Sequence, residues 1–129
     1  MPQEQETGSG LAVPPVLIRM LALWNEQDLS RIRGEIDEIF SPDVIFIDPD
    51  NHVVGRDAFE AMVKTFRTRL PRAVCSRSSG VDGHHDLHRY HWEIHQDGQR
   101  IIEGFDVVKV DASGLVSRVE GFFGAVPRR

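Results

Sequence analysis

The sequence predicts an α+β domain in which helices cover one face of a mostly antiparallel sheet. Before Pro71, apolar residues recur at three- and four-residue spacing, as on one face of a helix. After Pro71, β-rich stretches alternate with Asp-Gly and Ser-Gly pairs that are typical of hairpin turns. Helices followed by a meander of strands give an α+β fold. A curved sheet closed by helices leaves a concavity, where small molecules usually bind.

Length, charge and cysteine content narrow the class of protein. The chain has 129 residues, a net charge of −5 and one cysteine, Cys75. The acidic balance argues against nucleic acid or an anionic membrane as a partner, because both favour basic surfaces. No apolar run is long enough to span a bilayer, and no secretion signal is recognisable. A lone cysteine forms no internal disulfide and suits a reducing compartment, so we expect a cytoplasmic protein.

The polar residues 1–10 predict a disordered tail, and residues 11–129 form the predicted domain. Its first helix is predicted around Leu17–Trp24. A second is predicted over Leu29–Phe40, with Asp28 as its N-cap and a proline, Pro42, after it.

A strand and a third helix complete the first half. The β-branched and aromatic run Val44–Asp48 predicts a strand that ends at Pro49. The third helix is predicted to start at Asp57, with Glu60 completing a capping box. The strands expected after it are Ala73–Val81, Leu87–His95, Arg100–Val110 and Leu115–Val126, with turns at Asp82-Gly83, Asp97-Gly98 and Ser113-Gly114.

Four segments carry a family resemblance: LALWNEQDL, SPDVIFIDPDNHVVGRDAF, HRYHW and GFDVVKVDASGLVSRVEGFFG. In order and spacing they resemble the superfamily of ketosteroid isomerase and nuclear transport factor 2, which includes SnoaL-type polyketide cyclases. The resemblance implies a cone-shaped curved sheet with about three N-terminal helices closing an apolar pocket. It also implies a homodimer formed through the outer face of the sheet. This scaffold hosts non-catalytic binders too, so the fold alone does not define the function.

Asp48 is the first candidate catalytic residue. It ends a hydrophobic strand just before Pro49, and an apolar pocket disfavours the charged form of a carboxylate, which tunes it as a proton acceptor. The resemblance places Asp48 on the general base of the isomerases. The alternative is that this Asp-Pro pair only ends the strand and begins a turn.

Asp106 is the second candidate, because a charge inside the apolar strand Ile101–Val110 must be paired or neutral. Gly104 shares its face and could leave room for a ligand. The resemblance places Asp106 on the protonated aspartic acid of the isomerase oxyanion hole, or on an acid/base group of cyclase-like relatives. The alternative is a structural pair with Arg89 on a neighbouring strand.

One position departs from the isomerases, which carry a tyrosine on the first helix. Here that position is Met20, and the only tyrosine of the chain is Tyr90. Loss of one oxyanion donor typically lowers the rate by about 10² to 10³. Steroid isomerisation is therefore not expected.

The strand Leu87–His95 presents two alternative faces, and alternation does not decide which one lines the pocket. One face holds His88, Tyr90, Trp92 and Ile94, and the other holds Leu87, Arg89, His91, Glu93 and His95. If the second faced inward, Arg89 would lie between Asp48 and Asp106. That arrangement resembles limonene-epoxide-hydrolase-like members, where it activates a water. A metal site is not expected, because no two histidines from His84 to His95 have the two-residue spacing of strand neighbours.

The leading hypothesis is a cofactor-independent acid/base enzyme, an isomerase or cyclase, acting on a small apolar carbonyl or polyketide-like compound. Asp48 would be the base and Asp106 the acid or oxyanion donor, with His88, Arg89 or His91 assisting. No cofactor is expected, since no phosphate-loop pattern points to a nucleotide, and the histidine spacing given above argues against a metal. Alternatives are a non-catalytic ligand-binding or dimerisation module and an epoxide hydrolase. The predicted pocket lining comprises Met20, Trp24, Phe59, Val63, Tyr90, Trp92, Val108 and Phe122.

Overall fold

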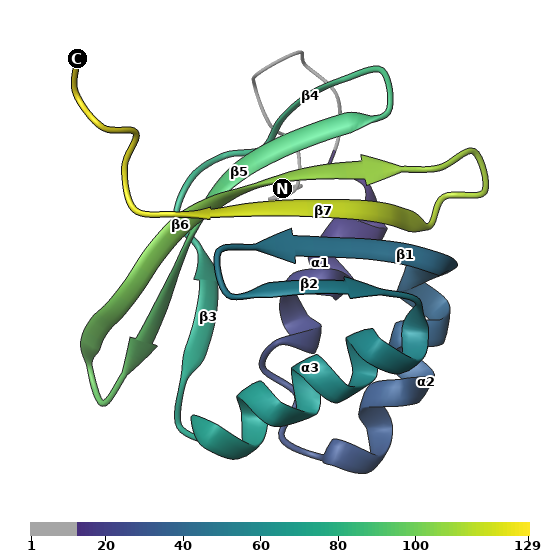
Figure 1. Ribbon diagram of the computed structural model, residues 1–129, viewed down its shortest axis with the longest axis horizontal. Coiled ribbons are helices and arrows are strands. Elements are labelled where there is room, and N and C mark those ends of the chain that lie inside the picture. Colours follow the sequence, from purple (N-terminus) through teal and green to yellow (C-terminus); the bar gives the residue numbers. More distant parts are fainter. Residues whose placement is uncertain (1–12) are drawn as a thin grey trace, which may run out of the picture.

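The computed structural model describes residues 13–129, in which three helices pack against one curved seven-stranded sheet (Figure 1). The predicted tail, residues 1–10, lies outside the described residues. The helices are α1 (Pro15–Leu23), α2 (Leu29–Ile39) and α3 (Arg56–Arg69). The strands are β1 (Phe40–Asp48), β2 (Asn51–Val54), β3 (Val74–Arg77), β4 (Asp82–His84), β5 (Leu87–Gln96), β6 (Gln99–Val110) and β7 (Val116–Phe123).

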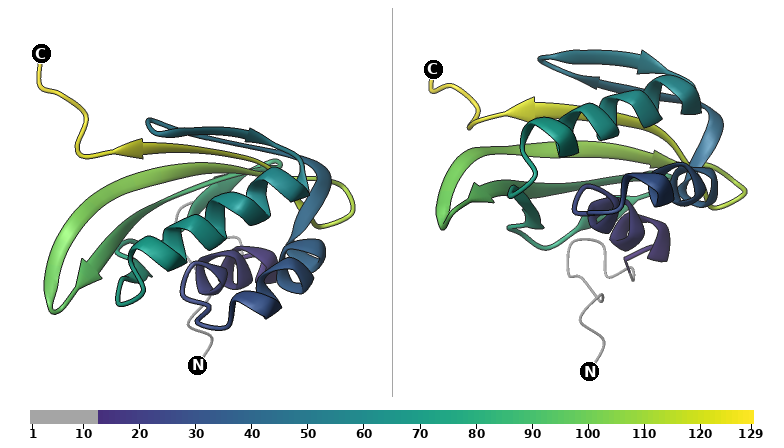
Figure 2. Two further views of the ribbon diagram at one scale, coloured as in Figure 1. Left: turned by 60° about the horizontal axis from the view of Figure 1, so that its bottom comes forward. Right: turned by 90° about the horizontal axis from the view of Figure 1, so that it is seen from below.

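The sheet has the strand order β2-β1-β7-β6-β5-β3, with β4 also paired to β5. Every pair is antiparallel except β1 with β7, which is parallel. The long strands β5 and β6 bend strongly, and the helices lie on the concave side of the sheet (Figure 2). This arrangement confirms the predicted α+β fold with a curved, mostly antiparallel sheet.

The hydrophobic core lies between the helices and the concave face. Helix α1 buries Leu17 and Met20, and α2 buries Ile32 and Ile36. The N-cap predicted for α2 is confirmed, because the Ser30 backbone N–H donates to the Asp28 side chain at 3.0 Å and so satisfies an end group of the helix.

The predicted capping box of α3 is wrong. The helix begins at Arg56, and its N-cap, Gly55, makes no side-chain cap bond. Instead, Arg33 of α2 donates through Nη1 to Asp57 Oδ1 at 2.6 Å and to Glu60 Oε1 at 3.0 Å. The two carboxylates therefore join α3 to α2 and do not cap α3. The local sequence around α3 gives no sign that their partner is Arg33.

The boundary between α2 and β1 also differs from the prediction. β1 begins at Phe40 and not at Val44, so Pro42 follows α2 as predicted but lies inside the strand, in the irregular stretch between Phe40 and Ile45 where the register with β7 shifts. A proline fits there because a bulged position needs no ladder N–H. The short strand β2 was not predicted.

Of the three predicted turns, the structure has two at the expected places and one elsewhere. Asp97 and Gly98 both have positive φ, 53° and 81°, which confirms the hairpin between β5 and β6. Gly114 also has positive φ, 87°, between β6 and β7.

The prediction of a turn at Asp82-Gly83 is wrong, because both residues lie in β4 and the chain turns at His85. Gly83 is needed for close approach: a Cβ there would lie 2.5 Å from Nδ1 of His88. Within residues 13–129, no helix has the length and apolar character needed to cross a membrane.

Candidate functional site

A row of inward-facing residues crosses the middle of the sheet and carries both candidate carboxylates. Asp106 of β6 pairs with Tyr90 of β5 on one side and with Gly121 of β7 on the other. Asp48, at the end of β1, lies beyond Gly121 in the parallel register of β1 and β7. Residues paired across neighbouring strands share a face of the sheet. The register therefore brings together two carboxyl groups that are far apart in the sequence.

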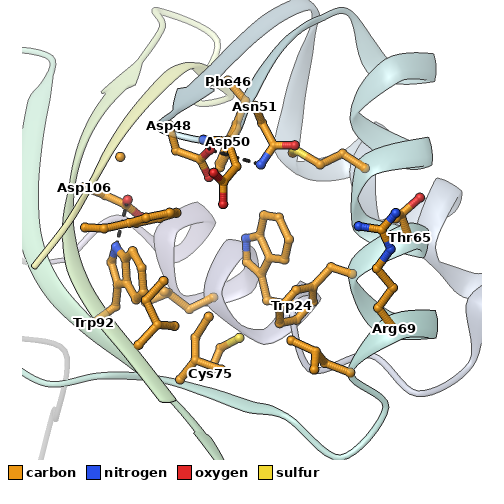
Figure 3. Close-up of a pocket in the computed structure, with 18 residues that line it drawn as sticks. Trp24, Phe46, Asp48, Asp50, Asn51, Thr65, Arg69, Cys75, Trp92 and Asp106 are labelled. Carbon is orange, nitrogen blue, oxygen red and sulfur yellow. Dashed lines mark hydrogen bonds between the residues drawn. The ribbon is translucent and has the colours of Figure 1, made fainter. Parts of the chain in front are cut away.

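The two carboxylates line one cavity of about 460 Å³ between the sheet and the helices. Figure 3 shows Asp48 and Asp106 on one side of this cavity and Arg69 of α3 on the other, with Trp24 between them. The lining residues are Leu21, Trp24, Phe46, Asp48, Asp50, Asn51, Met62, Thr65, Phe66, Arg69, Leu70, Cys75, Trp92, Ile94, Ile102, Asp106, Gly121 and Phe123. The walls are largely apolar and aromatic, and the polar groups are few, as in a small-molecule site.

Asp106 is held by two hydrogen bonds from β5. The Tyr90 hydroxyl donates to Oδ2 and the Trp92 indole N–H donates to Oδ1, each at 2.9 Å. Burial raises the pKa of Asp106 to about 6 and nearby Asp48 acts in the same direction, while the two hydrogen bonds lower it. A carboxyl group with this pKa exchanges its proton near neutral pH, as a general acid or base must. Tyr90 stays a neutral donor, because burial raises its pKa well above the usual value.

Asp48 has one oxygen committed and one available. Its Oδ1 accepts from the Asp50 backbone N–H at 2.9 Å and from Asn51 Nδ2 at 3.0 Å, which forms the turn between β1 and β2. No donor among residues 13–129 reaches Oδ2. Oδ1 therefore has the turn-forming role that was the alternative to catalysis, while Oδ2 remains available for proton transfer.

The inward face of β5 is the one that holds His88, Tyr90 and Trp92. Trp92 and Ile94 line the cavity, while Tyr90 is buried beside it. The outward face carries Arg89 and His91, both exposed.

The three residues expected to assist catalysis lie elsewhere. Arg89 donates to Asp82 at 2.8 Å on the outer surface, so it neither pairs with Asp106 nor lies between the carboxylates. The Asp-Arg-Asp arrangement of the epoxide-hydrolase hypothesis is absent for this reason. His91 packs against Phe105 on the outer face, with ring centroids 5.8 Å apart.

His88 faces inward but lies away from the carboxylates. It lines a second cavity of about 280 Å³ with residues of β4 and the start of β5. Burial lowers its pKa, so it is neutral at pH 7. Among residues 13–129, no group of three or more His, Cys, Asp or Glu side chains is placed to hold a metal ion.

The predicted pocket lining needs several corrections. Trp24 and Trp92 line the cavity, but four apolar residues are buried in the core behind it: Met20, Phe59, Val63 and Val108. Phe122 is on the outer face, because strand alternation gives the inward position to its neighbour Phe123. The space beside Gly104 holds the Trp92 indole, since a Cβ on Gly104 would lie 2.5 Å from that ring.

Several lining residues were missed by sequence reasoning. Four of them lie on one face of α3, at i, i+3, i+4 and i+7: Met62, Thr65, Phe66 and Arg69. This helical spacing could have predicted that they face the cavity together. Arg69 has no hydrogen bond or ion pair within residues 13–129. Cys75 also lines the cavity, and burial raises its thiol pKa to about 12.

The curved sheet, the three helices and the cavity between them give the chain the fold of nuclear-transport-factor-2-like proteins of known structure. The family model of the SnoaL-like domain matches residues 17–119, and the chain belongs to this family.

Solved structures share this fold. A SnoaL-like family protein from Agrobacterium tumefaciens, provisionally assigned as an isomerase, has a TM-score of 0.81 at 27% identity, over 85% of this chain and 95% of that one. A protein from Sinorhizobium meliloti, provisionally assigned as a polyketide cyclase, has a TM-score of 0.69 at 14% identity, over 84% and 94%. An NTF2-like protein of unknown function from Exiguobacterium has a TM-score of 0.71 at 18% identity, over 86% and 99%. A search of curated proteins gave no significant match.

Proposed function

We propose that this protein is a cofactor-independent acid/base enzyme of the isomerase or cyclase type, acting on a small apolar carbonyl or polyketide-like compound. The observation that carries the proposal is the row Asp48–Gly121–Asp106, which presents two neighbouring carboxyl groups of different environment to one apolar cavity. A paired acid and base require two such groups in different environments.

In the proposed reaction Asp48 Oδ2 removes a proton from the carbon next to the substrate carbonyl. The C–H electron pair moves into an enolate, and Asp106 donates a hydrogen bond or its proton to the carbonyl oxygen. In an isomerisation, Asp48 returns the proton to another carbon of the same conjugated system. In a cyclisation, the enolate carbon attacks a second carbonyl of the substrate, and the new alkoxide takes up a proton.

The first experiment is a screen of small ketones and polyketide-like compounds with the wild type, Asp48→Asn and Asp106→Asn. Each variant keeps the size of the side chain and removes its acid/base function. We expect each to lower kcat/KM by about 10² or more, in line with the loss of a general acid or base. An activity that both variants retain would show that the assigned roles are wrong.

The pH dependence of the same activity tests the role of Asp106. If Asp106 acts in its protonated form, kcat/KM falls as the pH rises through its pKa of about 6. The Asp106→Asn variant must lack this limb, because its amide does not titrate. A limb that persists unchanged in the variant assigns the titration to another group.

The second candidate function is a non-catalytic ligand-binding module, and the turn bonds of Asp48 Oδ1 favour it. In that case ligands bind in the cavity, no turnover is found, and both asparagine variants bind as the wild type does.

Two further properties belong to the proposal. The protein forms a homodimer through the outer face of the sheet, where the exposed Phe122 stacks on the half-buried Phe105 with ring centroids 4.8 Å apart. It acts in the cytoplasm, where the reducing conditions suit a chain with one cysteine.

A further inference from the structure

Trp24 presents an unused hydrogen-bond donor to the cavity. Its ring lines the cavity, and no acceptor within residues 13–129 bonds to the indole N–H. In Figure 3 the indole nitrogen is on the edge of the ring that faces Asp48 and Asp50. The other tryptophan, Trp92, differs because its N–H is already bound to Asp106. A half-buried indole N–H usually has a partner, so this donor is suited to a ligand oxygen.

The ring of Trp24 is also held in place. It contacts three aromatic rings, those of Phe46, Phe59 and Phe66, with centroids 5.8, 6.2 and 5.4 Å away. The Trp24 backbone carbonyl accepts from Arg67 Nη1 at 2.9 Å, and Arg67 is itself buried. The indole therefore has little freedom to turn toward another acceptor, and its N–H is a preorganised donor.

We infer that Trp24 forms a subsite for the carbonyl oxygen of the substrate, to which its indole N–H donates a hydrogen bond. The inference rests on the proposed function, and it adds a donor at the C-cap of α1 to the one that Asp106 supplies from β6. Trp24 is one helical turn after Met20, and unlike the buried Met20 its side chain lines the cavity. The ligand class is a compact apolar molecule with a ketone or similar oxygen.

The test uses the full chain, labelled with ¹⁵N, and a matched pair of probes. Acetophenone carries a carbonyl oxygen, and α-methylstyrene has a CH₂ group in its place. The chain has two tryptophans, so two indole N–H signals are expected, and Trp24→Phe assigns them. We expect acetophenone to move the Trp24 indole proton downfield and α-methylstyrene to move it little. The Trp92 N–H is already bound to Asp106, so it forms no new hydrogen bond with the ketone and a matching downfield shift is not expected there.

Affinities give a second readout. The wild type should prefer acetophenone to α-methylstyrene, and this preference should fall by roughly threefold to tenfold in Trp24→Phe, the range for one neutral hydrogen bond. Equal shifts from both probes, an unchanged preference in the variant, or no binding of either probe at millimolar concentration overturns the inference. Should Trp24→Phe fail to fold, Trp92→Phe assigns the two signals instead, and the shifts in the wild type decide.

This experiment needs no turnover, which separates it from the test of the proposed function. Ketone-specific shifts without any activity would support the subsite and contradict the acid/base enzyme. Loss of an activity in Asp48→Asn and Asp106→Asn, without ketone-specific shifts, would support the enzyme and contradict the subsite.

Discussion

Asp48 and Asp106 lie on different strands, and Gly121 between them has no side chain. A Cβ on Gly121 would be 3.1 Å from Asp106 Oδ1 and 3.3 Å from the Cβ of Asp48. Both contacts are tighter than ordinary packing, so a side chain there would push against both aspartates. The glycine is thus a condition for the two carboxyl groups to share one space.

We predict that Gly121→Ala lowers the free energy of unfolding by about 1–2 kcal/mol, because it overpacks the row. Displacement of Asp106 should also weaken the binding of acetophenone. The matched control is Gly34→Ala in α2, where no atom lies within 4 Å of the new Cβ. This variant should stabilise the protein by about 0.5–1 kcal/mol, because alanine favours a helix. Urea unfolding measures both, and equal effects would contradict the crowding argument.

At the scale of the elements, α1, α2 and α3 are joined by polar contacts at their ends. The buried Arg67 of α3 donates to the backbone carbonyls of Trp24, Pro71 and Ala73, at 2.8 to 3.0 Å. These bonds hold the end of α1 and the entry to β3 against α3, so the helical wall of the cavity depends on them. Another contact pairs Glu26, after α1, with Glu35 of α2.

Glu35 makes the stability of this corner depend on pH. Burial and a hydrogen bond with Glu26 raise its pKa to about 7 from an ordinary 4.5. A raised pKa in the folded state contributes stability that is complete below about pH 4.5 and is lost as the pH rises through about 7. We predict that Glu35→Gln, which keeps a donor for Glu26, stabilises the protein by about 1 kcal/mol at pH 8 and little at pH 5. Thermal unfolding at the two pH values measures this, and an equal gain at both would refute it.

The elements themselves were largely predictable, because helix periodicity and hairpin pairs such as Asp97-Gly98 are local signals. The site was only partly predictable. The sequence favoured Asp48 and Asp106, but it left open which face of β5 points inward, since both carry polar and apolar residues. The role of Gly121 depends on the register of three strands, and that of Arg33 on the approach of two helices. Such long-range relations are absent from the spacing of residues along the chain.

At the scale of the whole molecule, the helices within residues 13–129 cover one face of the sheet and leave the other uncovered. The uncovered face carries stacked Phe105 and Phe122, with Phe122 49% exposed, and Ile101 is 46% exposed near the start of β6. Exposed aromatic patches of this kind mark interaction surfaces. The face is therefore the proposed dimer interface.

We predict that the wild type sediments as a dimer at micromolar concentration and that Phe122→Lys sediments as a monomer, because a buried unpaired charge opposes association. Leu29→Lys, at an exposed position of α2, is the control and should leave the dimer intact. A monomeric wild type would rule out this interface.

Cys75 gives the molecule a chemical reporter inside the cavity. Its backbone N–H and carbonyl are bound by the side chain of Asn25 at 2.7 and 2.8 Å, so the residue is fixed in β3. Because burial keeps the thiol protonated at neutral pH, alkylation is slow and depends on how easily a reagent enters. Any occupant of the cavity shields the sulfur. The rate at which this single thiol is alkylated is therefore a footprint of cavity occupancy that needs neither a known substrate nor an assay of turnover.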